Sequence, residues 1–358
     1  MHILRGFFSE DLAIDLGTVN TIVYAPTEGV VLNEPSVLAL NKYNSEVLSI
    51  GSQALKLLGR EPNDIEVHRP IRRGAIDDFE ISQKFLRTVI SRVQHQDHPK
   101  RSHLVIGVPG SSTPLERRSV KDAARDAKAG RVDLVDEGLA AALGAGLDLE
   151  DEQARLVVDI GGGTTNVAIL ASGGVVSSVS LPAAGNAMDE AIRDYLRVRY
   201  AVQVGERTAE RVKRELGLAW TNFGEASDKR TEIVGKQLAN GTPLPITISS
   251  QEVRGALEPV LSEIISAVRR VIEDAKPEVT ADIYYSGITL TGGGALLSGM
   301  VERLHHDLNL RVTLADDPLT TVAVGAGRLL AEPEKLQRAA LRLDGPAWEG
   351  VEKLVVNW

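Results

Sequence analysis

The sequence of 358 residues contains no cysteine. Disulfide bonds, thiolate catalysis and cysteine-ligated metal sites are therefore excluded. No apolar run approaches the roughly 18 to 20 residues that cross a bilayer, and no secretory signal is present, so we expect a cytoplasmic protein. Positive charge is not in excess either, because the formal net charge is −9. We expect no nucleic-acid partner, since binding to a phosphate backbone needs a basic face.

The rest of the composition is that of an ordinary globular protein. Hydrophobic residues make up 43% and charged residues 25% of the chain, which is typical of soluble domains. A chain of this length can bury two medium-sized cores. Apolar runs typical of strands alternate with helical patterns, as in the strand at 103–109, the helix at 114–129, the strand at 132–135 and the helix at 138–147. This alternation predicts an α/β fold.

The most informative stretch is LVVDIGGGTTN at residues 156–166. Its apolar start predicts a buried strand, and Asp159 stands where that strand should end. Glycines without a Cβ allow a sharp turn and a close approach to a ligand, and the N–H groups of such a turn can converge on a phosphate. A carboxylate beside a phosphate suggests Mg²⁺ between them. The alternative is a tight hairpin that Asp159 merely caps.

A second stretch has the same pattern. LAIDLGTVNT at residues 12–21 again gives an apolar strand, an Asp and a glycine turn, and both copies continue into a second apolar run and then a Gly-Val-Val. The two acids are 144 residues apart (159 − 15). Such a repeat predicts two related domains that face one another. We therefore expect phosphates to be bound from both sides.

Further along the chain, two other features can be recognised. TGGGA at 291–295 is a third glycine turn, which we expect after a strand at 283–290 and before a helix. In the predicted helix at 206–216, Glu210 and Lys213 lie one turn apart and so share a face. The alternative for this pair is a surface salt bridge. We also expect a turn at 33–36 and irregular structure at 62–74.

The first eight residues, MHILRGFF, place Ile3, Leu4, Phe7 and Phe8 on one side of a helix. So short a segment does not hold a helix in water. At a membrane surface these four side chains can enter the headgroup boundary, and many copies in an assembly would bind through avidity. The alternative is a terminal extension packed on the first domain.

Five motifs, taken in order, resemble the bacterial actin MreB family, within the superfamily of actin, sugar kinases and heat-shock chaperone ATPases. They are DLGTVNT at 15–21, LNEPSV at 32–37, DIGGGTT at 159–165, ERVKRELG at 210–217 and LTGGGAL at 290–296. The likeness covers about residues 11–330. It implies an α/β, actin-like ATPase fold of two related domains, each with a central mixed sheet flanked by helices, and a nucleotide in the cleft between the domains.

The resemblance divides the chain into an N-terminal membrane-targeting segment, two domains and a tail. The expected limits are 1–10 for the segment, 11–150 for the first domain with a small subdomain at about 33–75, 151–331 for the second domain with a small subdomain at about 186–255, and 332–358 for the tail.

The resemblance also implies roles for individual residues. Asp15 and Asp159 would hold Mg²⁺ through its waters, since that ion gives up its hydration reluctantly. The residues that would bind ATP are Thr18, Val19, Asn20, Gly161, Gly162, Gly163, Thr164, Glu210, Arg211, Val212, Lys213, Gly292, Gly293, Gly294 and Ala295.

Glu137 is the candidate that orients the attacking water, and Asp136 is the second choice. Phosphoryl transfer depends mainly on position and charge, so one placed carboxylate suffices for slow hydrolysis. The alternative is an acid that only favours a helix start. The chain departs from the family here, with Gly138 where relatives have Pro, and with Asn186 in place of a second Gly. We expect both changes to affect hydrolysis more than binding, and Gly138 to loosen Glu137.

Three functions are consistent with this superfamily. The first is a weak ATPase that polymerises into filaments on the inner face of the cell membrane, where it organises cell-wall synthesis and cell shape with membrane proteins of wall elongation. The second is a small-molecule kinase, for which we find no additional acid aimed at an acceptor hydroxyl. The third is a chaperone ATPase, which would need a peptide-binding domain of about 100 residues or more. We expect the first.

Overall fold

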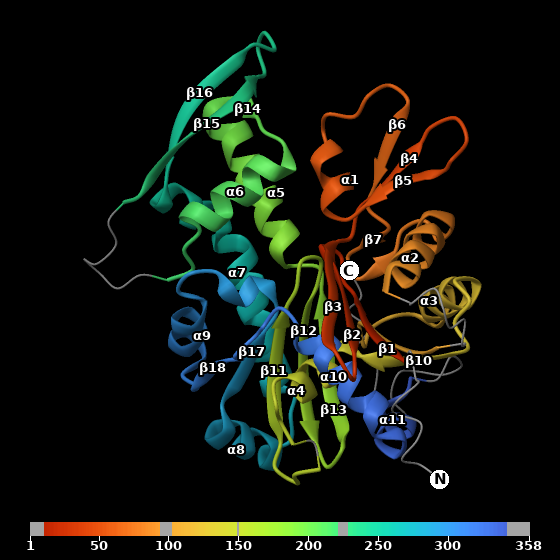
Figure 1. The fold of residues 1–358 in the computed structure, drawn as a ribbon. Helices are drawn as coiled ribbons and strands as arrows, with labels where there is room; N and C mark the ends of the chain where they lie inside the picture. Colours follow the sequence, from red (N-terminus) through yellow and green to blue (C-terminus); the bar gives the residue numbers. More distant parts are fainter. Residues whose placement is uncertain (1–10, 94–101, 149, 221–227, 342–358) are drawn as a thin grey trace.

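The computed structural model describes residues 11–93, 102–148, 150–220 and 228–341. Its framework is a pair of five-stranded sheets (Figure 1), and we call the parts built around them the first half and the second half. The first sheet has the order β10-β9-β1-β2-β3, with strands Arg131–Asp136, His103–Val108, Leu12–Leu16, Asn20–Ala25 and Gly29–Pro35. The second has the order β18-β17-β11-β12-β13, with strands Val312–Leu314, Ile288–Thr291, Arg155–Ile160, Thr165–Ala171 and Gly174–Leu181.

The two sheets have the same topology. In the first, β1, β2 and β3 form an antiparallel meander, while β9 and β10 lie parallel to β1 on its other side. In the second, β11, β12 and β13 form the meander, and β17 and β18 add in parallel. The repeat and the mixed α/β fold predicted from the sequence are thereby confirmed.

The central strands are buried on both faces, as their continuous apolar runs require. In β11, Leu156, Val158 and Ile160 pack into the core of the second half, whereas Val157 points to a core shared with the first half. Strand β1 divides in the same way, with Ala13 in the shared core. Alternate residues of each central strand therefore join the half to its own helices and to the other half.

The shared core holds helices α4, Glu137–Gly144, and α10, Thr321–Ala331, between the two sheets (Figure 1). Helix α10 packs on α4, β1 and β9, although it lies late in the sequence. The outer helices of the first half are α2, Phe79–Val93, and α3, Pro114–Asp126. Those of the second half are α5, Gly185–Tyr200, α6, Glu206–Leu216, α7, Ser250–Glu273, α8, Pro277–Ser286, and α9, Met300–Leu308.

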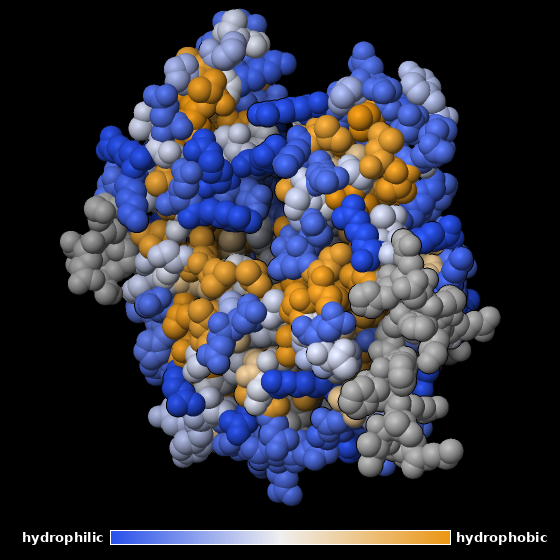
Figure 2. Space-filling model, in the orientation of Figure 1, coloured by the Kyte–Doolittle hydropathy of each residue, from blue (hydrophilic) through white to orange (hydrophobic). Residues whose placement is uncertain are grey.

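Each half also carries a small sheet. In the first half it has the order β5-β4-β6, with strands Val47–Ile50, Leu38–Asn41 and Ile65–His68, beside α1, Ser52–Leu57, and the hairpin of β7, Ile71–Arg72, and β8, Ala75–Ile76. In the second half the order is β14-β15-β16, with strands Val202–Gln203, Arg230–Gln237 and Pro243–Ser249. Figure 2 shows a notch between these upper parts, rimmed by hydrophilic residues.

One ion pair crosses that notch. Arg69, just after β6, lies 3.1 Å from Glu206, the first residue of α6, measured from Nη2 to Oε2. The two residues are 137 positions apart and belong to opposite halves. This contact and the shared apolar core therefore join the halves at opposite ends.

Three local predictions were wrong. The turn expected at 33–36 belongs largely to β3, which continues to Pro35, and the stretch 62–74 contains β6 and β7. The strand expected at 283–290 begins only at Ile288. Before it, Pro277 starts α8 at a position that needs no N–H donor, and Gly287 ends that helix at a φ of 75°.

The expected tail is described only in part. Helix α11, Pro333–Ala339, occupies its start, and Leu336 packs into the shared core. Residues 342–358 and the N-terminal segment 1–10 lie outside the described residues. Across the described ranges, no helix is both long and apolar enough to cross a membrane.

The packing of α4 on α10 depends on two glycines, and substitution tests it. A Cβ on Gly325 would overlap the carbonyl oxygen of Ala140, and one on Gly144 would overlap that of Thr321. We expect Gly325→Ala to destabilise the protein by about 1–3 kcal/mol, the usual range for overpacking. Gly255→Ala in α7 is the matched control, because a Cβ there meets no atom within 4 Å.

Gly255→Ala should instead stabilise by roughly 0.5–1 kcal/mol, through helix propensity alone. Thermal unfolding of both variants beside the parent protein checks the pair. Equal melting temperatures for the two variants would contradict the close packing between the sheets.

Candidate functional site

The two repeated turns meet between the halves. The turn at residues 17–20 joins β1 to β2, and the turn at 161–164 joins β11 to β12. A Cβ on Gly162 would overlap Val19, and one on Gly163 would overlap Thr18. The glycines of the second turn are therefore needed for this close approach. The sequence predicted that the repeats face one another, and the structure confirms it.

The two repeated acids occupy equivalent positions. Asp15 pairs with Gly107 of β9, and Asp159 pairs with Thr291 of β17. Burial, followed by the charge of Asp159, raises the pKa of Asp15 to about 7. Burial also raises the pKa of Asp159, although the Thr291 hydroxyl donates to its Oδ1 at 2.8 Å and opposes that rise. The two carboxylates, Asp159 buried and Asp15 half-buried, thus share one electrostatically unfavourable site.

Asp136 and Glu137 bring two further carboxylates to this site. Asp136 caps α4, because its Oδ1 accepts the N–H of Leu139 at 2.9 Å. Burial raises its pKa to about 6. Glu137 is the first helical residue and is buried, and its pKa is raised well above the usual value by burial and then by the charges of Asp15 and Asp159. Asp136 therefore has the helix-capping role, while Glu137 faces the repeated acids.

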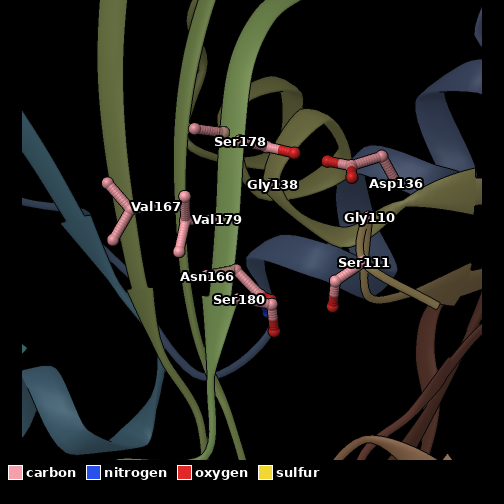
Figure 3. Close-up of a pocket in the computed structure, with 10 residues that line it drawn as sticks. Gly110, Ser111, Asp136, Gly138, Asn166, Val167, Ser178, Val179 and Ser180 are labelled. Carbon is pink, nitrogen blue, oxygen red and sulfur yellow. The ribbon is translucent and has the colours of Figure 1, made fainter. Parts of the chain in front are cut away.

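Figure 3 shows the crevice beside Asp136. Ser178 points toward the Asp136 carboxylate from β13, and Ser111 faces Asn166 and Ser180 from the opposite wall. Gly138 also lines this crevice, and a Cβ on it would lie 2.8 Å from the Cβ of Ala168. Gly138 thus packs closely on β12, and the looser Glu137 carboxylate expected from the sequence stays a prediction.

A divalent cation fits this group of carboxylates. The described ranges contain no cluster of three or more His, Asp or Glu side chains that could hold a metal by themselves. Mg²⁺ is usually bound by one or two carboxylates together with waters and phosphates. Asp15 and Asp159 would supply that pair, and a cation between them would offset their repulsion.

Thr18 and the second glycine turn have further contacts that fix their shape. The Thr18 hydroxyl accepts the N–H of Gly74 at 2.9 Å, so its own proton remains available to donate. The N–H groups of Gly185 and Asn186 donate to the carbonyls of Gly161 and Gly162, at 3.2 and 2.7 Å. The start of α5 therefore holds the turn, with Asn186 as one of its donors.

Helix α6 carries Glu210 and Lys213 toward the same region, but they do not pair with each other. Lys213 bonds to Asp189 at 2.9 Å and to the carbonyl of Gly185, whereas Glu210 bonds to Arg214 at 2.6 Å. The salt bridge between Glu210 and Lys213 that the sequence left open is therefore absent.

The two remaining predicted residues of α6 differ in exposure. Arg211 lies on the outer surface and pairs with Glu215 at 3.3 Å. Val212 is buried in the core of the second half. Val212 therefore presents no exposed surface to a ligand in this structure.

The third glycine turn packs behind Asp159. A Cβ on Gly292, whose φ is 83°, would overlap the carbonyl of Ile160, and one on Gly294 would overlap the Ile160 side chain. Ala295 is buried in the adjoining core. Gly293 has only Leu319 nearby, at 3.2 Å. Two of the three glycines are therefore needed for internal packing, and Gly293 has the most open surroundings.

Sequence reasoning missed Asn166, Thr291 and Asp189. Thr291 could have been found from its place at the end of β17, the strand that pairs in parallel with β11. Asp189 could have been found from its place near the start of α5. The sequence pattern aligned Asn20 with Asn166, but the strand register pairs Ile22 with Asp15 and Asn166 with Asp159. Asn166 is therefore equivalent to Ile22.

The raised pKa of Asp15 predicts how stability depends on pH in the nucleotide-free protein. An unfolded Asp titrates near 3.9, whereas native Asp15 keeps its proton up to about pH 7. The native state therefore loses stability as the pH rises from about 4 to about 7. Asp15→Asn removes this loss. At about pH 8 we therefore expect the free energy of unfolding of this variant to exceed that of the parent by roughly 2 kcal/mol, and its melting temperature to be higher.

At about pH 4.5 the difference should shrink to about a quarter of this, because the pH there is only about 0.6 units above the pKa of an unfolded Asp, while native Asp15 is still protonated. Thermal unfolding in a chelator at the two pH values measures this. The same melting-temperature difference at both would show that Asp15 is not in a shared acidic site.

Comparison with known proteins adds to this geometry. The sequence model of the family described as MreB/Mbl protein matches residues 9–338. The chain is 41% identical to the cell shape-determining protein MreB of Escherichia coli (strain K12), over 91% of this chain and 94% of that protein. It is 37% identical to the cell shape-determining protein Mbl of Bacillus subtilis (strain 168), over 93% and 99%.

Solved structures agree. MreB5 of Spiroplasma citri bound to AMPPNP matches with a TM-score of 0.86 and 34% identity, over 92% of this chain and 98% of that one. The MamK double helical filament matches with a TM-score of 0.75 at 21% identity, over 90% and 99%, which is a likeness of fold alone. These relatives do not favour a small-molecule kinase, and the actin-like fold is confirmed. The chain belongs to the MreB/Mbl family.

Proposed function

We propose that this chain is an ATP-dependent, actin-like filament protein that determines cell shape. The observation that carries the proposal is the buried group of carboxylates between two facing glycine turns, one from each half. A magnesium nucleotide satisfies both parts of it, because the cation offsets the carboxylates and the turns present N–H groups to phosphates. A structure of MreB5 bound to AMPPNP, at 34% identity, supports a nucleotide in this cleft.

The site residues divide into three roles. Asp15 and Asp159 hold Mg²⁺, which would neutralise charge that develops on the phosphates. Thr18, Val19 and Asn20 bind the phosphates together with the turn at 161–164. The adenosine lies between α6, through Glu210 and Lys213, and the third glycine turn at 292–295.

Hydrolysis requires a positioned water and a carboxylate to accept its proton. Glu137 is placed for this because it is buried, lies beside the repeated acids and does not cap its own helix. Asp136 is the second candidate, but its Oδ1 is occupied by Leu139. One oriented carboxylate supports a slow rate, which suits a reaction coupled to assembly.

Assembly and membrane attachment complete the proposal. Subunits carrying ATP associate into a filament of identical chains, and hydrolysis alters the closure of the halves and so their contacts. The filament lies on the inner face of the cell membrane through Ile3, Leu4, Phe7 and Phe8, and recruits membrane proteins of wall elongation. The names of the MreB and Mbl relatives, which call them cell shape-determining, support this role.

Sedimentation with ATP and Mg²⁺ tests assembly together with the role of Glu137. The parent protein should pellet in ATP and release phosphate slowly. Glu137→Gln should lower phosphate release by about 10²-fold or more while pelleting in ATP persists. Glu263→Gln, on the exposed face of α7, is the matched control and should behave as the parent does. A soluble protein that transfers phosphate to a small acceptor would refute the proposal.

Co-sedimentation with anionic liposomes tests membrane attachment. We expect the parent filament to be recovered with liposomes, and Phe7→Ser/Phe8→Ser to reduce recovery by about 10-fold, since each buried CH₂ contributes about 0.8 kcal/mol. Assembly in ATP without liposomes should be unchanged in this variant. Full liposome recovery of the variant would place the contact elsewhere on the chain.

A further inference from the structure

Asn166 makes a buried hydrogen bond between the halves. It lies in β12 of the second half with 5% of its surface exposed. Its Nδ2 donates to Oε2 of Glu137, at the start of α4, over 2.7 Å. A hydrogen bond closed off from water is electrostatically stronger than one at the surface. The Glu137 side chain is therefore held by a group from the opposite side of the site.

The side-chain amide of Asn166 also acts on Asp159. Asn166 lies directly opposite Asp159 in the register of β11 and β12, and a hydrogen bond from it partly opposes the rise that burial causes in the pKa of that carboxyl. Its Oδ1, in contrast, is buried without a partner among the residues that the structure describes. An unpaired buried oxygen destabilises the folded protein, because it loses its hydrogen bonds to water. Its presence calls for a reason beyond packing.

The repeat shows that packing alone does not require an amide here. The equivalent position in the first hairpin is Ile22, opposite Asp15, and it is 3% exposed. An apolar side chain therefore suits this register position in the same type of hairpin. The two positions differ in that Asn166 faces Glu137. The Asn166 amide is therefore explained by its hydrogen bond to Glu137 and not by the packing of the hairpin.

We propose that Asn166 is a positioning residue for ATP hydrolysis, which fixes the Glu137 carboxylate from the opposite half. This inference rests on the proposed function. With Oε2 held by the amide, the carboxylate accepts a proton from the attacking water. The water oxygen bonds to the γ-phosphorus as the bond to the bridging oxygen breaks, and ADP leaves with that electron pair. Glu137 follows directly on β10 of the first half, and Asn166 lies in β12 of the second, so the orientation of the carboxylate depends on both halves.

The test is a double-mutant comparison of single-turnover hydrolysis with ATP and Mg²⁺. Asn166→Leu removes the amide at similar volume and should lower the rate by about 10- to 10²-fold, as expected for a lost orientation. Affinity for a fluorescent ATP analogue should stay within about twofold, since the amide contacts the carboxylate and not the nucleotide. In a Glu137→Gln background the same substitution should cause no further loss, because Asn166 acts through Glu137.

Ser177→Ala is the matched control, because Ser177 lies on the same strand β13 opposite Ile169 and is not among the residues that line the crevice beside Asn166. It should hydrolyse ATP as the parent does. Asn166→Ala serves as a second variant if the leucine lowers the melting temperature. An equal fractional loss in both backgrounds, or a loss of affinity that accounts for the loss of rate, would overturn the positioning role.

Failure of the proposed function gives a different result. A parent protein that binds ATP without hydrolysing it would overturn both proposals. If the parent pellets and hydrolyses ATP, and Asn166→Leu hydrolyses it at the same rate, only the positioning role of Asn166 is overturned.

Discussion

Repulsion among buried carboxylates is the constraint on which the site depends. Asp15, Asp159 and Glu137 each have a raised pKa, and for two of them the neighbouring acids add to the effect of burial. Evolution does not retain such a group for stability, because each ionised acid opposes the others in a medium of low dielectric. In the proposed function a cation between the turns would offset this repulsion, so the arrangement is already shaped for a magnesium nucleotide.

The duplicated sheet explains how two acids from distant parts of the chain come to face one another. Identical topology places Asp15 and Asp159 at the same point of two central strands. Alternate residues of those strands form the shared core with α4 and α10, which fixes the halves against each other at one end. The turns can then interlock at the other end, since Gly162 and Gly163 carry no Cβ that would keep them apart. Precision at the site comes from packing far from it.

The local sequence pattern was sufficient to predict the hairpins, the repeated acids and the glycine turns, because each depends on only a few consecutive residues. It was insufficient wherever register or tertiary pairing decides. Asn20 resembled Asn166 in sequence, but the strand register makes Ile22 the equivalent residue. Lys213 was matched with Glu210 by helical spacing, yet it pairs with Asp189 of α5. The start of β17 was placed too early because the apolar residues of α8 resemble a strand until Gly287 is taken into account.

The contacts between the halves differ in kind from one end to the other. Near α4 and α10 they are apolar and closely packed, and such packing resists sliding. Toward the small sheets they are polar and few, as in the pair Arg69–Glu206, where water can replace each partner at little cost. The halves should therefore turn about the shared core and open at the notch. The bond from Asn166 to Glu137 lies toward the closely packed end, because Gly138, next to Glu137, packs on Ala168 of the same strand β12.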